Sequence, residues 1–360
     1  MKKQLQIFFD FLRFCIGSAK EIPGSLKEVD WKELYAIAKK QCLVGILFDG
    51  IKKLPAKYVG MKKELLLQWM AESQMLEKAN VRLNDAAIQI SEWFGKKGFR
   101  TCILKGQGNA LMYPNPYSRT PGDIDIWVEG EDKRVISFVR SISPHEKACY
   151  HHIEFPSYKG VEVEVHYRPS FLLCFLHNRK LQKYYERVKE EQFSHRVMFG
   201  EQREVAIPTV EFNLIFQLTH IYAHLMNEGI GLRQLLDYYF VLLHADIKNV
   251  VELQRILKHI GLWKFAGAIM YIMHEVFGMP ASRLIVPPKE KYGKFVLNEV
   301  LEAGNFGKQD ERNRFGRSKL GHNLQRVYRD MRLVKYFPTE ALSEPFFRTW
   351  HYFWRMKNKK

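Results

Sequence analysis

The chain has 360 residues and a formal net charge of +17, and it is 46% hydrophobic and 14% aromatic. This composition excludes an intrinsically disordered chain and allows a large core, with two or three sub-domains expected at this length. A basic balance of this size is typical of proteins with an anionic partner, although basic residues spread along a whole chain also fit a solvated surface.

The five cysteines are odd in number and show no CxxC spacing, which favours free thiols in a reducing cytoplasm over a disulfide framework. The longest uncharged apolar run, 212–227, contains His220 and His224. It is shorter than the roughly 20 residues that span a bilayer. We therefore expect a cytoplasmic protein without stable membrane insertion.

The pattern of apolar residues predicts three segments. Residues 1–92 form an N-terminal helical segment, with helices near 5–15, at 31–40 after the N-cap Asp30, and from about 62 to 94. Residues 93–208 alternate strands and helices and include two predicted hairpins, at 151–167 and 196–207. Residues 209–360 are again helical and end in a basic tail. The predicted fold class is α+β, a mixed sheet with flanking helices between two helical segments.

Two acidic residues begin the strand predicted at 123–128. Side chains alternate along a strand, so Asp123 and Asp125 share one face while Ile124 and Ile126 point into a core. Carboxylates so close repel each other unless a cation lies between them, and oxygen ligands favour Mg²⁺. A solvated turn followed by an exposed aspartate explains the same pair equally well.

A second acidic strand follows at 161–166. Its valines face one side, and Glu162, Glu164 and His166 face the other. An ordinary half-exposed strand looks the same. If the two acidic strands pair, however, three carboxylates meet, and such a set holds two Mg²⁺ ions in phosphoryl transfer.

A third feature precedes the aspartates, where Lys105, Gly106 and Gln107 join a predicted strand to a helix. Free N–H groups at a helix start bind phosphate, glycine permits close approach, and lysine adds positive charge. A plain strand-to-helix turn is the simpler explanation of this feature alone.

Together these residues resemble the nucleotidyltransferase superfamily (DNA polymerase β-like), and more closely a group of uncharacterised bacterial nucleotidyltransferase-like proteins. The resemblance is carried by Leu104-Lys105-Gly106, Arg119, Gly122-Asp123-Ile124-Asp125 and Glu164-Val165-His166. It extends to Trp31, Leu34 and Ala38, His220 and His224, 232–237 and 304–307, and so covers most of the chain.

The resemblance implies a role for each motif residue. Asp123, Asp125 and Glu164 would bind Mg²⁺ or Mn²⁺, and Glu164 would help to activate the attacking hydroxyl, with Glu162 as its rival. Lys105, Gly106 and Gln107 would hold the triphosphate. The superfamily usually has serine or glycine after this glycine, so Gln107 leaves phosphate binding to the backbone amides.

Other candidates remain open between a functional and a structural role. Arg119 contacts a phosphate or is a loop arginine, and His166 orients Glu164, touches substrate or is structural. His220 and His224 fit a core role better than zinc. Arg233 and Asp237, four residues apart, form a helix salt bridge or point into the cleft. A basic loop binds along a nucleic-acid backbone or is simply exposed to solvent. It contains Lys308, Arg312, Arg314, Arg317 and Lys319.

The expected function is a metal-dependent nucleotidyltransferase that moves a nucleoside monophosphate from an NTP, ATP included, to an acceptor and releases pyrophosphate. RNA or a tRNA end, a protein and a small molecule all remain as acceptors. The alternative is a non-catalytic nucleotide- or RNA-binding protein on the same fold.

Overall fold

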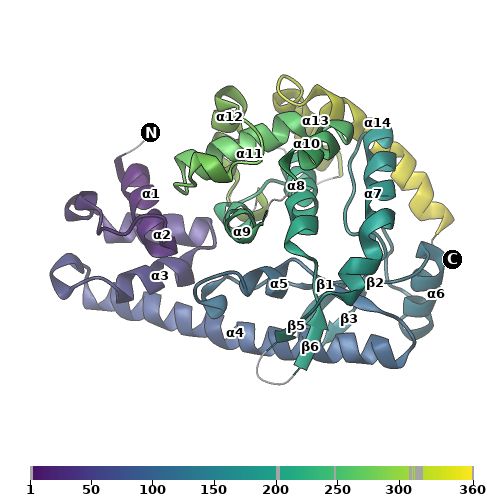
Figure 1. Ribbon diagram of the computed structural model, residues 1–360, viewed down its shortest axis with the longest axis horizontal. Helices are drawn as coiled ribbons and strands as arrows, with labels where there is room; N and C mark the ends of the chain where they lie inside the picture. Colours follow the sequence, from purple (N-terminus) through teal and green to yellow (C-terminus); the bar gives the residue numbers. More distant parts are fainter. Residues whose placement is uncertain are drawn as a thin grey trace.

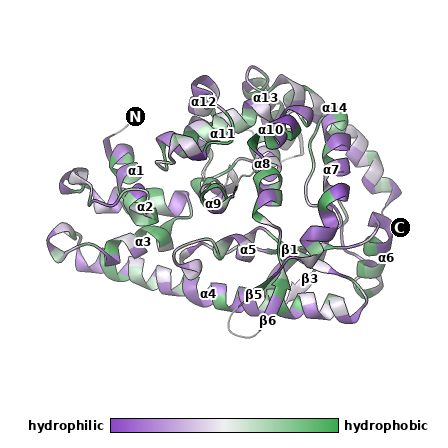
Figure 2. Cartoon of the chain, in the orientation of Figure 1, coloured by the Kyte–Doolittle hydropathy of each residue, from purple (hydrophilic) through white to green (hydrophobic). Residues whose placement is uncertain are grey.

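The computed structural model describes residues 3–199, 203–246, 249–307, 310, 312 and 319–358. Long helices surround a small sheet (Figure 1). Most residues of α11 (Trp263–Glu275) are hydrophobic, whereas α4 (Lys63–Lys96) mixes hydrophobic and hydrophilic residues along its length (Figure 2). None of the helices in the described ranges is both long enough and apolar enough to cross a bilayer.

The N-terminal helices pack at one end of α4, which runs along one side of the whole molecule (Figure 1). The Asp30 carboxylate accepts from the Lys32 and Glu33 amides and starts the second helix where the sequence predicts. The elements before the sheet are α1 (Lys3–Ile16), η1 (Gly24–Glu28), α2 (Trp31–Lys40), α3 (Val44–Lys52), η2 (Ala56–Tyr58) and α4.

The main sheet has four strands in the order β1-β2-β4-β3. The central pair, β2 and β4, is parallel, and both outer pairs are antiparallel. The elements of this segment are β1 (Thr101–Leu104), α5 (Gly106–Ala110), η3 (Pro116–Ser118), β2 (Ile124–Val128), α6 (Asp132–Ile142), β3 (His152–Tyr158), β4 (Val161–His166) and α7 (Phe175–Ser194). Strands β5 (Arg196–Phe199) and β6 (Arg203–Ala206) form a separate hairpin.

The C-terminal helices lie over the opposite side of the sheet from α4 (Figure 1). They are α8 (Val210–Asn227), α9 (Leu232–His244), α10 (Val250–His259), α11, α12 (Glu290–Ala303), α13 (Lys319–Leu333) and α14 (Pro338–Lys357), with η4 (Ala281–Arg283) and η5 (Asn305–Gly307) between them.

Two hydrophobic clusters divide the interior at the sheet. One face of the sheet, with Ile103, Ile126 and Val165, packs with buried residues of α4 and α6. The other face contributes Cys102 and Trp127 to a larger cluster that joins helices from both ends of the chain. The alternation along β2 thus places its isoleucines in one core and directs Asp125 toward the C-terminal helices.

The predicted α+β class and the paired acidic strands are confirmed, as are both hairpins. Helix α3 was not predicted. All five cysteines are free thiols. Much of the predicted basic loop, including Lys308, Arg314 and Arg317, lies outside the described residues. Arg312 is described and pairs with Glu299 and Asp310, at 2.8 Å from each.

Candidate active site

A cavity of about 250 Å³ lies between the polar face of the sheet and helices α8 and α9. The sheet and the loops before its strands contribute acidic residues, and α8 contributes histidines. Its lining includes Lys105, Gly106, Arg119, Gly122, Asp123, Asp125, His151, His152, Glu164, Gln217, His220, His224, Arg233 and Asp237.

The parallel pairing of β2 with β4 brings the predicted carboxylates together. Asp125 is the register partner of Glu164, and Asp123 lies directly before β2. One carboxylate oxygen from each of the three residues lies within 4.8 Å of the other two. Glu162, two residues earlier on β4, is exposed to solvent. The geometry therefore groups Glu164, rather than Glu162, with the aspartates.

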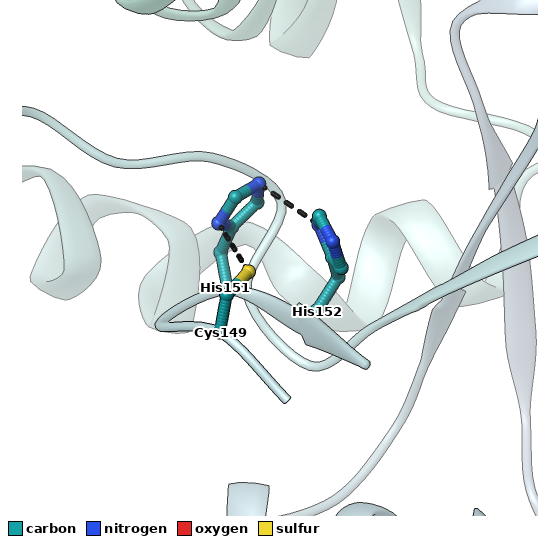
Figure 3. Close-up of side chains that lie close together, drawn as sticks. All are labelled: Cys149, His151 and His152. Carbon is teal, nitrogen blue, oxygen red and sulfur yellow. Dashed lines mark hydrogen bonds between the residues drawn. The ribbon is translucent and has the colours of Figure 1, made fainter. Parts of the chain in front are cut away.

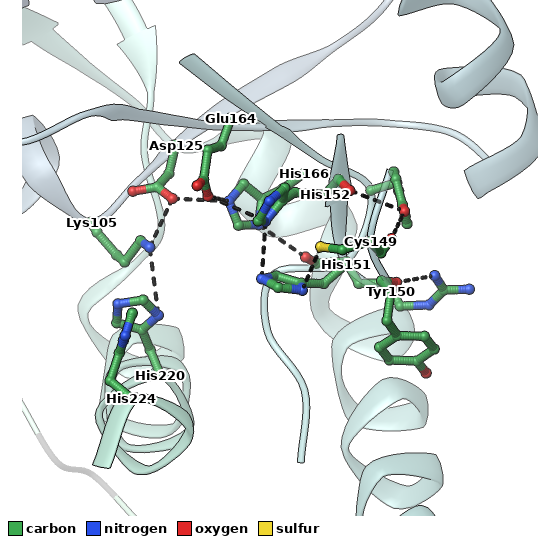
Figure 4. Close-up of polar contacts among 12 residues, drawn as sticks. Lys105, Asp125, Cys149, Tyr150, His151, His152, Glu164, His166, His220 and His224 are labelled. Atoms are coloured by element: carbon green, nitrogen blue, oxygen red, sulfur yellow. Dashed lines mark hydrogen bonds and ion pairs between the residues drawn. The ribbon is translucent and has the colours of Figure 1, made fainter. Parts of the chain in front are cut away.

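Two cationic groups contact Asp125 (Figure 4). Lys105 Nζ lies 2.8 Å from Asp125 Oδ1. His166 Nε2 lies 2.9 Å from the same oxygen and 3.3 Å from Glu164 Oε2. His166 therefore bridges two of the three carboxylates, which is the orienting position predicted as one of its alternatives.

The charges shift the pKa values of these groups in opposite directions. The Asp125 carboxylate, and then burial, raise the pKa of Asp123 to about 6. Burial opposes ionisation of Asp125, but Lys105 and His166 outweigh it and lower the pKa of Asp125. Burial also opposes the charged form of His166 and so lowers its pKa, but the hydrogen bonds to Asp125 and Glu164 outweigh burial and raise that pKa to about 9. Asp123 is thus the carboxylate with the least compensated charge.

The donor set fits a hard divalent cation. Three carboxylates converge from two adjacent strands, and they are buried or half-buried. Oxygen-only ligands of this kind suit Mg²⁺ or Mn²⁺. The raised pKa of Asp123 is the expected behaviour of a carboxylate beside a like charge when no cation lies between the two.

The backbone between β1 and α5 adopts an unusual conformation. Lys105 has φ 47° and ψ −142°, and Gly106 has φ 38°. A non-glycine residue at positive φ costs about 1–3 kcal/mol and is found most often at functional sites. This conformation places Lys105 against Asp125 and Gly106 at the cavity wall.

The Gln107 side chain points to α4, whereas Lys105 and Gly106 line the cavity. This glutamine side chain is buried, at 3% exposure, and donates from Nε2 to Asn84 Oδ1 on α4. The side chain therefore helps to attach α5 to α4, and the predicted contact of residue 107 with a triphosphate rests on its backbone.

Arg119 and Asp237 form a buried ion pair across the cavity wall. Arg119 Nε and Nη2 each lie 2.8 Å from an Asp237 oxygen, and the Tyr113 hydroxyl donates to Asp237 Oδ1 at 2.7 Å. Arg233 Nη1 donates to the Thr120 carbonyl at 3.0 Å. These contacts attach the loop that precedes Asp123 to α9. The phosphate contact of Arg119 stays a prediction. Asp237 is bonded to Arg119 and Tyr113, the charge of Arg233 also favours its ionised form, and both Arg233 and Asp237 line the cavity.

Four further histidines lie near the carboxylates. His220 Nδ1 is 3.5 Å from Lys105 Nζ, and the rings of His220 and His224 are 4.2 Å apart. His152 Nδ1 is 3.2 Å from Glu164 Oε2. His151 and His152 both line the cavity. Sequence reasoning missed His151 and His152. The available signal was the run Cys149-Tyr150-His151-His152, which places three potential metal ligands directly before an acidic hairpin.

The fold and the site define a class of protein. A parallel strand pair that carries three clustered carboxylates, beside a lysine-glycine junction between strand and helix, is the arrangement expected of a nucleotidyltransferase.

Residues 27–278 match the family described as "Uncharacterised nucleotidyltransferase", and the chain belongs to that family. The matched range contains every residue of the cavity lining.

No curated protein matches the sequence. Among solved structures, the crystal structure of an antigenic nucleotidyltransferase-like protein from Paracoccidioides brasiliensis is similar over 57% of this chain and 94% of that chain, with 13% sequence identity and a TM-score of 0.34.

Proposed function

We propose that the protein transfers a nucleoside monophosphate from an NTP to an acceptor hydroxyl or phosphate and releases pyrophosphate, as members of the DNA polymerase β-like superfamily do. The observation that carries this proposal is the convergence of Asp123, Asp125 and Glu164 within 4.8 Å at the wall of one cavity.

In this proposal the three carboxylates hold Mg²⁺ or Mn²⁺. A bound divalent cation neutralises the triphosphate and stabilises the charge that develops during transfer. Glu164 accepts the acceptor's proton as the acceptor oxygen bonds to the α-phosphorus. The bond from that phosphorus to the bridging oxygen breaks, and pyrophosphate leaves. Burial raises the pKa of Glu164, but the hydrogen bond from His166 and the charges of His152 and His166 together lower it, so that the ionised form of Glu164 is available for this step.

Lys105 has a second role in this scheme. Its ammonium lies 2.8 Å from Asp125 Oδ1, beside Gly106. Burial lowers the pKa of Lys105, but Asp125, Asp123 and Glu164 together outweigh this effect and raise it, so the side chain stays charged. We infer that Asp125 would give up this contact if it held a divalent cation, and that Lys105 would then be available to bind the triphosphate near the Gly106 amide.

Net charge bears on the choice of acceptor, and the state of the cysteines bears on the location of the protein in the cell. A net charge of +17 suits RNA or a tRNA end, and a protein or small hydroxylated acceptor fits the same chemistry. Five free cysteines fit a reducing cytoplasm.

Binding of Mg²⁺–NTP tests the site through a matched pair of variants. We expect Mg²⁺–ATP or another Mg²⁺–NTP to raise the thermal midpoint of the parent and of Glu162→Gln. The shift should be lost in Glu164→Gln, because only Glu164 lies with the aspartates. Equal shifts of the thermal midpoint in both variants would show that Glu164 is not part of the metal site.

A further inference from the structure

The turn that leads into β3 and the first residue of β3 together carry a thiol and two imidazoles. Cys149 Sγ lies 3.4 Å from His151 Nδ1, and His151 Nε2 lies 3.1 Å from His152 Nδ1 (Figure 3). One ligand atom from each of the three residues lies within 4.8 Å of the other two. All three residues are half-buried, and His151 and His152 line the cavity.

The backbone of this turn is held at every carbonyl. The Cys149 amide donates to the His152 carbonyl at 2.9 Å, and the amides of Tyr167 and Arg168 donate to the His151 carbonyl at 3.1 and 3.2 Å. Arg168 Nη1 donates to the Tyr150 carbonyl at 2.8 Å, and the Tyr167 hydroxyl donates to the Cys149 carbonyl. The three side chains therefore project from a fixed backbone, and a ligand needs to order side chains only.

The ligand types differ from those of the carboxylate site. One thiolate and two neutral imidazoles are ligands that Zn²⁺ prefers, whereas Mg²⁺ prefers oxygen. With Zn–S near 2.3 Å and Zn–N near 2.0–2.1 Å, tetrahedral geometry separates neighbouring ligand atoms by roughly 3.3–3.6 Å. Each of the two short contacts, at 3.4 and 3.1 Å, is close to these values, but the two contacts involve different nitrogens of His151. One set of three ligand atoms lies within 4.8 Å of one another, so binding a metal would draw these atoms closer together.

We propose that Cys149, His151 and His152 bind Zn²⁺ as a second metal site, with the fourth coordination position facing the cavity. The two short contacts use different nitrogens of His151, so this ring turns to present one nitrogen to the metal while Cys149 and His152 stay in place. The Phe171 ring, 4.7 Å from the His151 ring, covers the site from the side. Three protein ligands with an open position are the arrangement of catalytic zinc sites.

The site adjoins the carboxylates without depending on them. His152 Nδ1 is 3.2 Å from Glu164 Oε2, so a metal held by that nitrogen lies next to Glu164. The thiol and His151 have no counterpart in the Mg²⁺ site. The zinc proposal therefore stands or falls separately from the proposed nucleotidyl transfer.

Cobalt titration of the metal-stripped 360-residue protein tests the proposal. Co²⁺ replaces Zn²⁺ in such sites and gives a thiolate-to-cobalt charge-transfer absorption that carboxylate or histidine ligands do not give. We expect one equivalent of Co²⁺ to produce this band and Zn²⁺ to abolish it by displacement. Cys149→Ser should lose the band, and His152→Asn should weaken Zn²⁺ binding by more than about tenfold.

Two variants serve as controls. Cys174 lies with His177 and Glu340 in another group of potential ligands, so Cys174→Ser should keep the band if the thiolate is Cys149. Asp125→Asn removes a carboxylate of the other site and should also keep it. Circular dichroism confirms that each variant is folded. A parent protein that gives no charge-transfer band, or a band lost in Cys174→Ser or Asp125→Asn, would overturn the proposal.

Discussion

Replacing Asp237 by asparagine nearly keeps the side-chain volume but removes the charge that holds Arg119. Both residues are buried, at 3% and 4% exposure, and two bonds of 2.8 Å join them. Breaking a buried pair by removing one partner leaves an uncompensated charge and costs about 3–5 kcal/mol. We expect Asp237→Asn to lose that much free energy of unfolding in urea denaturation.

The double variant Arg119→Met with Asp237→Leu removes both charges. Replacing a buried pair by apolar residues is often close to neutral, so the remaining loss should come from the Tyr113 hydroxyl, which loses its acceptor at 2.7 Å, and from buried Arg233, whose charge Asp237 also favours. Since Arg233 loses this carboxylate in Asp237→Asn as well, the double variant should lose less free energy of unfolding than that single variant does. As a control, Glu252→Gln breaks an exposed pair with Arg255 and should leave the urea midpoint unchanged.

Nucleotide binding by the double variant separates the two roles of Arg119. If Arg119 positions the loop before Asp123, Mg²⁺–NTP binding should return together with stability. The reasoning is refuted if the double variant loses as much free energy of unfolding as Asp237→Asn, or more. Binding that stays lost in a stable double variant would instead assign the phosphate contact to Arg119.

Two further predictions concern neighbouring residues. Gln107→Ala should lower the free energy of unfolding by about 1–2 kcal/mol, because Asn84 loses its hydrogen-bond partner. It should change Mg²⁺–NTP affinity by less than about threefold, because the Gln107 side chain points to α4. A larger loss of affinity in calorimetry would show that the side chain contacts the phosphates. In metal-free buffer the folded state retains the Asp123 proton that the unfolded state has released, so the parent should lose stability as pH rises from about 4 to about 6. Asp123→Asn should lack that loss, saturating Mg²⁺ should suppress it in the parent, and parallel urea stability curves for parent and variant would contradict this assignment.

Local patterns predicted the elements whose cause is local. The Asp30 cap fixed the start of α2, and the strict alternation of Val161–His166 gave β4 and its acidic face. Helix α3 was missed because it is short, because its N-cap, Leu43, makes no side-chain capping bond, and because seven of its nine residues are buried. This helix also contains Gly45, which its packing requires, since a Cβ there would lie 2.3 Å from the Ser118 carbonyl oxygen.

The sequence predicted many of the residues that belong to the site, but not the contacts between residues that are distant in the sequence. Alternation placed Asp125 and Glu164 on acidic faces, and their pairing required only that two strands be neighbours. The bridging position of His166 and the contact of Lys105 with Asp125 depend on the register of that pairing. The bonds from Arg119 to Asp237 join residues 118 positions apart, and no local spacing indicates them.

Transfer of labelled nucleotide is the most direct test of the central claim. The full-length protein is incubated with each α-labelled NTP, Mg²⁺ or Mn²⁺, and total RNA or lysate, and each fraction is examined for label. The proposed function predicts label in one acceptor fraction, dependent on the divalent cation and lost in Asp125→Asn. Label that persists equally in Asp125→Asn, or no label in any fraction with the parent protein, would contradict it.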